Sequence, residues 1–242
     1  MAQDETIEFE LPSGIPVKIK EIDGAAEKAL TNQKLLKSGR AMNVLMLKAL
    51  VSYDGKPLPT NEGEANSILL DMKTGDRNYL LLRIRMQSYG NEIIFNRECP
   101  KCHKTSGYKM DLQEMLDKGE LKVYPFRDDV PIIVETRDGV AEVDYMTGRT
   151  EQWLMQQKEI DSVIMALAAC KMFNNHAPTY KEFENMRAKD LNKIRLTFLD
   201  LKGGLDPRIE LVCLDCNNSY SISLHEIPDF FIPRTTTATI GL

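Results

Sequence analysis

Two Cys-x-x-Cys pairs are the residues of this sequence best suited to chemistry. Cys99 and Cys102 lie in ECPKCHKTSGYKM, and Cys213 and Cys216 lie in VCLDCNNSYSISL. An apolar, strand-like run precedes each pair and an alternating run follows it, as expected for a zinc knuckle, a tight turn between two strands. Two such knuckles together would supply the four thiolates of a tetrahedral structural zinc site.

The two pairs lie in similar surroundings, which indicates an internal duplication. One offset of 114 positions (213 − 99) separates four pairs of residues: Cys99 and Cys213, Cys102 and Cys216, Asp76 and Asp190, Gly90 and Gly204. The repeated unit is predicted to be a β-hairpin, two helices and a knuckle, which makes the fold class α+β. The first repeat is predicted to span 1–118 and the second 119–225, with an extended tail at 226–242.

Hydrophobic period and turn residues predict the elements within each repeat. Hairpins are expected at 6–22, around Pro12-Ser13-Gly14, and within 131–145, around Asp138-Gly139. Apolar runs predict helices at 38–52 and 159–173. Thr74 or Asp76 is expected to cap a helix that ends at Gly90.

A shared zinc site requires the two knuckles to meet, although 110 residues (213 − 102 − 1) separate Cys102 from Cys213. A twofold arrangement of the repeats would bring them together. Four thiolates leave no position for water, so the site is predicted to be structural, with one zinc per chain. Iron in a rubredoxin-like site uses the same ligands, but it ranks below zinc because no feature of a redox partner is visible.

Enzymatic alternatives find less support in the sequence. Thioredoxin-type Cys-x-x-Cys motifs precede a helix, whereas a strand pattern follows Cys102. His103, His176 and His225 are the only histidines, and each is interpreted as a solvated loop residue, with replacement of a thiolate ligand the alternative for His103. Cys170, in an apolar run, is interpreted as a buried small side chain. With no phosphate-binding loop, nucleophile elbow or His-Glu-x-x-His motif, the protein is predicted not to be an enzyme.

Composition is that expected of a soluble intracellular protein. The 242 residues are enough for one large or two small domains. No apolar run approaches the roughly 18 residues of a membrane span, and the acidic N-terminus does not resemble a signal peptide. With 31 basic and 36 acidic residues, the net charge is −5, which gives no overall electrostatic footprint for nucleic acid.

A zinc ribbon that binds nucleic acid is the alternative function. The first knuckle has a basic edge, formed by Arg97, Lys101, Lys104 and Lys109. The second knuckle has no matching basic residues, whereas a nucleic-acid clamp needs a continuous basic stripe with aromatic residues between. Nucleic acid is therefore a less favoured partner than protein.

The chain resembles the baseplate hub subunit or hub-assembly chaperone family of T-even phages, which also occurs in contractile injection systems. The resemblance lies in LPSGIPVKIKEIDGAAEKAL, KLLKSGRAMNVLM, GDRNYLLLRIRMQSYGNEIIFNRECPKC and IELVCLDCNNSYSISL, and it covers most of the chain. It implies a non-enzymatic structural or assembly protein of a contractile tail, with other tail and hub proteins as partners. It implies a location in the host cytoplasm during assembly or in the tail baseplate, and it matches the four cysteines to the family's knuckle positions.

The segment after the second knuckle provides a separate indication of partner binding. Phe230, Phe231 and Ile232 lie in an apolar run bounded by prolines. Such a run cannot cover itself as a helix, so it either packs on its own domain or binds a partner as an extended strand. These three residues are the predicted partner-binding residues.

Overall fold

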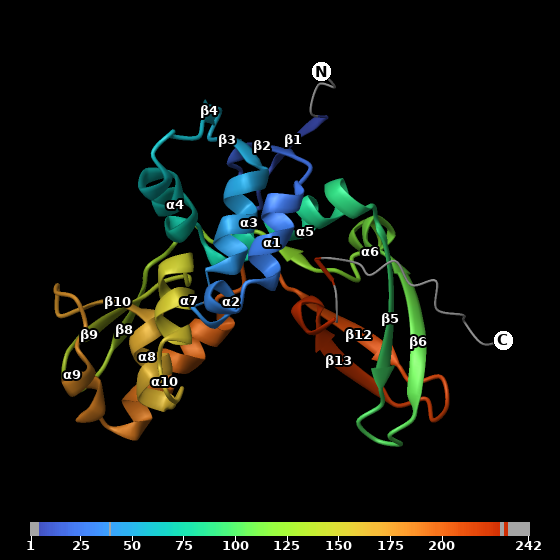
Figure 1. Ribbon diagram of the computed structural model, residues 1–242. Coiled ribbons are helices and arrows are strands. Elements are labelled where there is room, and N and C mark those ends of the chain that lie inside the picture. The colour runs from blue at the N-terminus through green and yellow to red at the C-terminus, as the bar shows by residue number, and fades with distance from the viewer. Residues whose placement is uncertain (1–4, 39, 228–229, 232–242) are drawn as a thin grey trace.

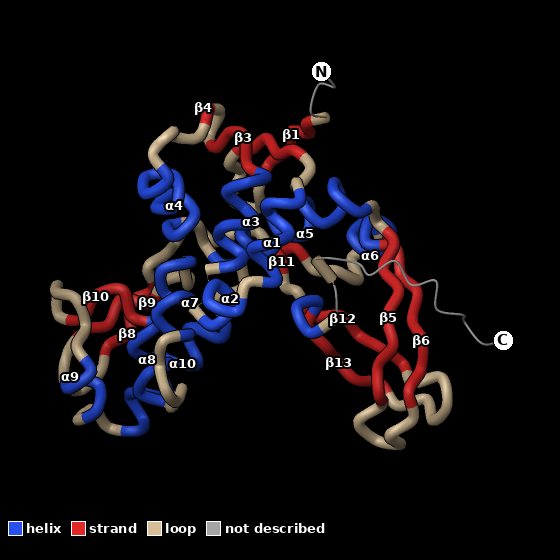
Figure 2. The backbone as a smooth tube through the Cα atoms, in the orientation of Figure 1, coloured by secondary structure: helices blue, strands red, loops and turns tan. Residues whose placement is uncertain are grey.

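The computed structural model describes residues 5–38, 40–227 and 230–231 as a mixed α+β chain with a central body and two arms (Figure 1). No helix within these ranges is long and apolar enough to cross a bilayer. Figure 2 shows the strands as short pieces distributed among all three parts, so no single large sheet organises the molecule.

The central body combines an antiparallel sheet of order β1-β2-β3-β4 with five helices, of which α2 contacts α1. The strands are β1 (Thr6–Glu10), β2 (Pro16–Lys20), β3 (Leu50–Tyr53) and β4 (Lys56–Pro57). The helices are α1 (Gly24–Thr31), α2 (Gln33–Lys37), α3 (Ala41–Ala49), α4 (Glu62–Asp71) and α5 (Thr74–Tyr89). Apolar residues of α3, α4 and α5, among them Leu45, Leu69 and Leu80, are fully buried against the sheet.

The helical arm repeats part of this arrangement on a smaller scale. Its sheet has the order β10-β9-β8 and is packed against α8 and α10. The elements are β8 (Ile132–Glu135), β9 (Val140–Val143), α7 (Gly148–Met155), α8 (Ser162–Ala169), β10 (Cys170–Phe173), α9 (Tyr180–Glu184) and α10 (Ala188–Asp200).

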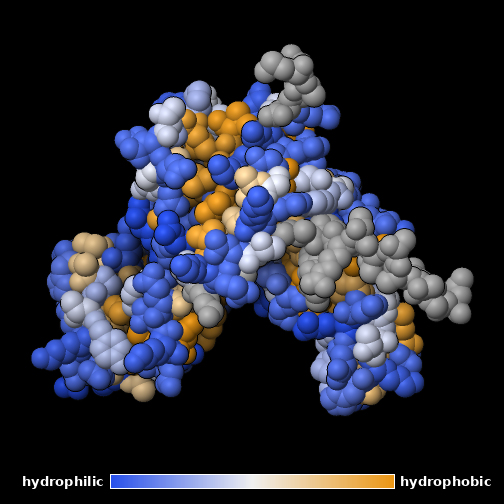
Figure 3. Space-filling model, viewed as in Figure 1, coloured by the Kyte–Doolittle hydropathy of each residue, from blue (hydrophilic) through white to orange (hydrophobic). Residues whose placement is uncertain are grey.

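The knuckle arm consists of two long antiparallel ribbons that lie side by side (Figures 1 and 2). One ribbon is β5 (Glu92–Glu98) with β6 (Thr105–Asp111), and the other is β12 (Arg208–Val212) with β13 (Ser219–Ser223). Short elements join the ribbons to the body: α6 (Leu112–Asp117), β7 (Val123–Tyr124), β11 (Gly204–Leu205) and the 3₁₀ turn η1 (Leu224–Glu226). Figure 3 shows a hollow between the knuckle arm and the helical arm.

Two predicted helices end earlier than the sequence indicated, and in the same way. The helix predicted at 38–52 ends at Ala49, and the one predicted at 159–173 ends at Ala169. The next residues, Leu50 and Cys170, have extended backbone, with ψ of 123° and 117°. They begin strands that pair with β2 and β9, so sheet pairing overrides the apolar helical pattern.

The predicted N-cap of α5 was wrong, because Asp76 has a different role, whereas Gly90 is the C-cap at the end where the helix was predicted to stop. Lys73 is the N-cap of α5, and no side chain caps this end. Asp76 is buried, and its carboxylate accepts a hydrogen bond of 3.1 Å from the backbone N–H of Ser13 in the β1–β2 turn. The carboxylate of Asp190, on α10, likewise accepts a bond of 3.4 Å from the N–H of Arg137 in the β8–β9 turn. Each aspartate therefore ties a helix to a hairpin turn.

Replacing Asp76 with alanine is expected to lower the free energy of unfolding by about 1–3 kcal/mol, because the buried N–H of Ser13 loses its acceptor. Asp76→Asn keeps an acceptor oxygen. Burial raises the pKa of Asp76, so a neutral amide is tolerated there and should cost less than alanine. Urea denaturation of both variants measures the difference. If both variants lose the same free energy of unfolding, the hydrogen bond from Ser13 is not the source of the stability that Asp76 contributes.

Candidate metal centre

The two ribbons of the knuckle arm pack face to face through their apolar sides. Alternate residues of β5 and β6, such as Ile93, Phe95 and Tyr108, are buried in one core with Ile209 and Ile222 of the other ribbon. The period-2 pattern of each ribbon puts all of these side chains on one face. This packing brings the two knuckle turns to the same end of the arm.

The two knuckle turns have the same backbone geometry. The N–H of Cys99 donates to the carbonyl of Lys104 at 2.9 Å, and the N–H of Cys213 donates to that of Asn218 at 2.9 Å. His103 and Asn217, 114 positions apart, both adopt a left-handed backbone, with φ of 60° and 54°. Each ribbon therefore presents its two sulfur atoms in the same way.

The four sequence-predicted cysteines meet in one cluster. The Sγ atoms of Cys99 and Cys216 are 3.7 Å apart, as are those of Cys102 and Cys213, so each close pair joins the two knuckles. All four Sγ atoms lie within 4.8 Å of one another. Sulfur atoms at tetrahedral corners about 2.3 Å from a zinc ion would be about 3.8 Å apart. Two of the separations are close to that value and the others lie within about 1 Å above it, and the spacing excludes a disulfide, whose S–S bond is about 2.05 Å.

The electrostatics of the cluster favour a bound cation. Backbone N–H groups of Cys216 and Asp215 stabilise the thiolate of Cys213 and lower its pKa to about 6. The N–H of Asn218 acts on Cys216 in the same direction, but burial and the neighbouring sulfur atoms outweigh it and raise the pKa of Cys216 to about 12. Four thiolates this close repel one another, so a divalent cation is what allows all four to be charged.

Polar groups around the cluster also connect the two knuckles. The ammonium of Lys104 lies 2.8 Å from the carboxylate of Asp215 across the arm. The hydroxyl of Tyr108 donates to the carbonyl of Val212 at 3.2 Å and lies 3.1 Å from the hydroxyl of Tyr220. Cys99 and Cys213 are buried, whereas Cys102 and Cys216 are partly exposed, so an ion can enter from one side.

The three histidines and the fifth cysteine of the sequence lie outside this cluster. His103 is exposed and pairs with Glu98 at 2.9 Å, so its ring is turned to a carboxylate. His176 is exposed and lies 3.3 Å from Glu182. Cys170 is buried as predicted, in β10, where burial raises the pKa of its thiol to about 11. The four knuckle cysteines are the group of His, Cys, Asp and Glu residues close enough to hold a metal within the described chain.

The predicted partner-binding residues do not share one environment. Phe230 is buried in the core of the knuckle arm, and its carbonyl accepts a hydrogen bond of 2.6 Å from Arg85 of α5. Phe231 is partly buried and packs edge-on against Phe230. Ile232 lies outside the described residues. Partner binding by this segment stays a prediction.

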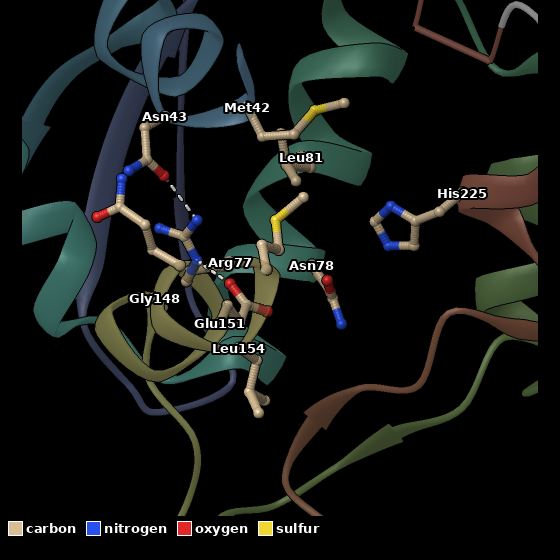
Figure 4. A pocket seen from close by; sticks show the side chains of 11 residues that line it. Met42, Asn43, Arg77, Asn78, Leu81, Gly148, Glu151, Leu154 and His225 are labelled. Carbon is tan, nitrogen blue, oxygen red and sulfur yellow. Dashed lines mark hydrogen bonds and ion pairs between the residues drawn. The ribbon is translucent and has the colours of Figure 1, made fainter. Parts of the chain in front are cut away.

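A pocket of about 350 Å³ where α3, α5, α7 and η1 meet was not found by sequence reasoning (Figure 4). Its walls carry apolar side chains, such as Leu81 and Met155, and the imidazole of His225, which is exposed at the pocket mouth as its prediction as a solvated residue requires, although partial desolvation lowers its pKa. Beside it, the buried guanidinium of Arg77 pairs with Glu151 at 2.8 Å and donates to Asn43. These residues come from distant parts of the chain, and no local pattern marks them.

Comparison with known proteins shows which family the chain belongs to. A family model described as T4 bacteriophage base plate protein matches residues 5–232. The chain belongs to this family. The match covers the hairpins, both knuckles and all four clustered cysteines of this base plate protein. No curated protein and no solved structure is similar enough to match it.

Cobalt(II) substitution tests the ligand set of this base plate protein directly. Four thiolates around one tetrahedral ion are expected to give strong sulfur-to-cobalt charge-transfer bands. Cys99→Ser and Cys213→Ser should each lower this absorbance by at least about a quarter, because each removes one of the four thiolate ligands. Cys170→Ser is the matched control and should leave the spectrum unchanged. A Cys99→Ser variant that keeps the full four-sulfur spectrum would contradict the shared site.

Proposed function

We propose that this base plate protein is a non-enzymatic structural or assembly factor, chaperone-like in action, for the hub of a contractile phage tail. Other hub and tail proteins would be its partners, in the host cytoplasm during assembly or in the tail baseplate. The observation that carries the proposal is the family match over most of the chain together with a closed four-cysteine cluster, which suits structure rather than catalysis.

We infer that one structural zinc per chain occupies the cluster. The soft donor set and the approach of all four sulfur atoms to within 4.8 Å of one another support zinc. The ion would hold the two ribbons of the knuckle arm together at their tips, and so would fix the surfaces that partners recognise.

We infer further that the chain is an internal duplication, with repeats at 1–118 and 119–225 and a tail at 226–242. Support comes from the matching geometry at one offset of 114 positions (190 − 76): the aspartates that bind the hairpin turns, the identical knuckle turns, and positive φ at Gly90 and Gly204. The two helix-to-strand changes at Leu50 and Cys170 follow the same plan.

The alternative of a zinc ribbon that binds nucleic acid has weaker support. Three of the four basic residues on the edge of the first knuckle are paired with carboxylates of this chain: Arg97 with Glu226, Lys104 with Asp215, Lys109 with Glu92. Paired charges release few counterions from a phosphate backbone, so they add little to nucleic-acid affinity.

Co-expression with the hub and tail-tube proteins of a contractile phage tests the function. The affinity-tagged wild-type chain is expected to co-purify with at least one of them. Cys99→Ser should lose that partner, and the control Cys170→Ser should keep it. Failure of the wild-type chain to retain any tail protein, together with a salt-sensitive shift of DNA or RNA, would overturn the proposal in favour of the alternative.

A further inference from the structure

Helix α10 presents an exposed face that combines apolar and basic side chains. Leu196 is 52% exposed and Leu199 is 60% exposed. Lys193 and Lys189 are also exposed and lie about one and two turns before Leu196, on the same side of the helix. The opposite side of α10, with Ile194 fully buried, packs in the core of the helical arm.

The matching face of α5 is covered. The residues 114 positions before Leu196 and Leu199 are Leu82 and Arg85, which are only 2% and 3% exposed. Leu82 packs in one core with Leu205 and Phe230, and Arg85 donates to the carbonyl of Phe230. The cover of α5 is therefore supplied by two segments that follow α10 in the chain, β11 and the end of the described tail.

No described segment provides the same cover for α10, because the segments that follow it lie on α5. The two helices are otherwise placed alike: each buries one side against its own hairpin sheet and binds the hairpin turn through an aspartate. The face of α5 is therefore covered by other segments of the chain, whereas the equivalent face of α10 is exposed to solvent.

Charge indicates what would complete the open face. The ammonium of Lys193 donates to the main-chain carbonyl of Glu135. Arg195, partly exposed, adds a third positive charge on these turns, and the exposed Asp200 after Leu199 adds one negative charge, so the turns are positive on balance. Since the whole chain has a net charge of −5, this is a basic strip on an acidic protein. A strip of this kind is complementary to carboxylates beside apolar groups.

We propose that the α10 face binds an extended segment of another base plate protein that carries apolar side chains beside carboxylates. The leucines would bury the apolar side chains, and the lysines would pair with the carboxylates. The inference rests on the proposed function and on the duplication, and it specifies which chemical groups a partner must carry to bind α10. The segment that covers α5, with Glu226 and Phe230, has this composition and serves as the probe.

The test titrates a synthetic peptide with the sequence of residues 224–231, LHEIPDFF, into the zinc-loaded full chain and follows backbone amide resonances. Saturable shifts are expected in α10. Leu199→Ser should weaken binding about tenfold, as loss of a central apolar contact does. Lys193→Glu should weaken it severalfold through charge alone. A peptide with Gln and Asn in place of the two carboxylates should bind Lys193→Glu and the wild-type chain equally.

Three results would overturn the proposal. The first is the absence of shifts in α10 at millimolar peptide, and the second is shifts confined to α5 and β11, which would mean exchange with the resident segment. The third is a concentration-dependent dimer that Leu199→Ser abolishes, which would assign the face to a second copy. Zinc content and retention of tail proteins by the wild-type chain are measured in parallel. Loss of those two properties counts against the proposed function, whereas their persistence without peptide binding counts only against the α10 site.

Discussion

The meeting of four cysteine sulfur atoms from two distant knuckles is the constraint on which the knuckle arm depends. Two ribbons far apart in the sequence end in the same turn and bring four sulfur atoms within 4.8 Å of one another. Without a cation, charging one thiolate makes charging the next harder, because like charges at this distance repel each other. A divalent ion bound to all four sulfur atoms would join the two halves of the chain.

Helix α5 connects the knuckle arm to the central body, because it packs in the cores of both. Leu80 and Ile84 pack in the central body, whereas Leu82 and Met86 pack in the core of the knuckle arm. Its side chains also reach the end of the second half, through the hydrogen bonds of Arg85 to Phe230 and of Asn78 to Leu205. The orientation of the knuckle arm relative to the body therefore follows from one helix with two buried faces.

The parts of this structure that could be predicted from sequence are those with a local signature. The spacing of the cysteines predicted the knuckles, and their strands were found where the alternation placed them. The predicted helices at 38–52 and 159–173 were too long, because pairing of Leu50 and Cys170 with distant strands is invisible locally. The hydrogen bond of Asp76 to the hairpin turn and the pocket at Arg77 depend on contacts between distant residues, so no local pattern reveals them.

Native mass spectrometry of the purified chain, before and after treatment with a strong chelator, tests the central claim most directly. The account predicts one zinc per chain, and a shift to unfolded charge states when the zinc is removed, because the ion joins the two ribbons. A chain without metal, or one lighter by two hydrogens because a disulfide has formed, would contradict a structural zinc shared by the two knuckles.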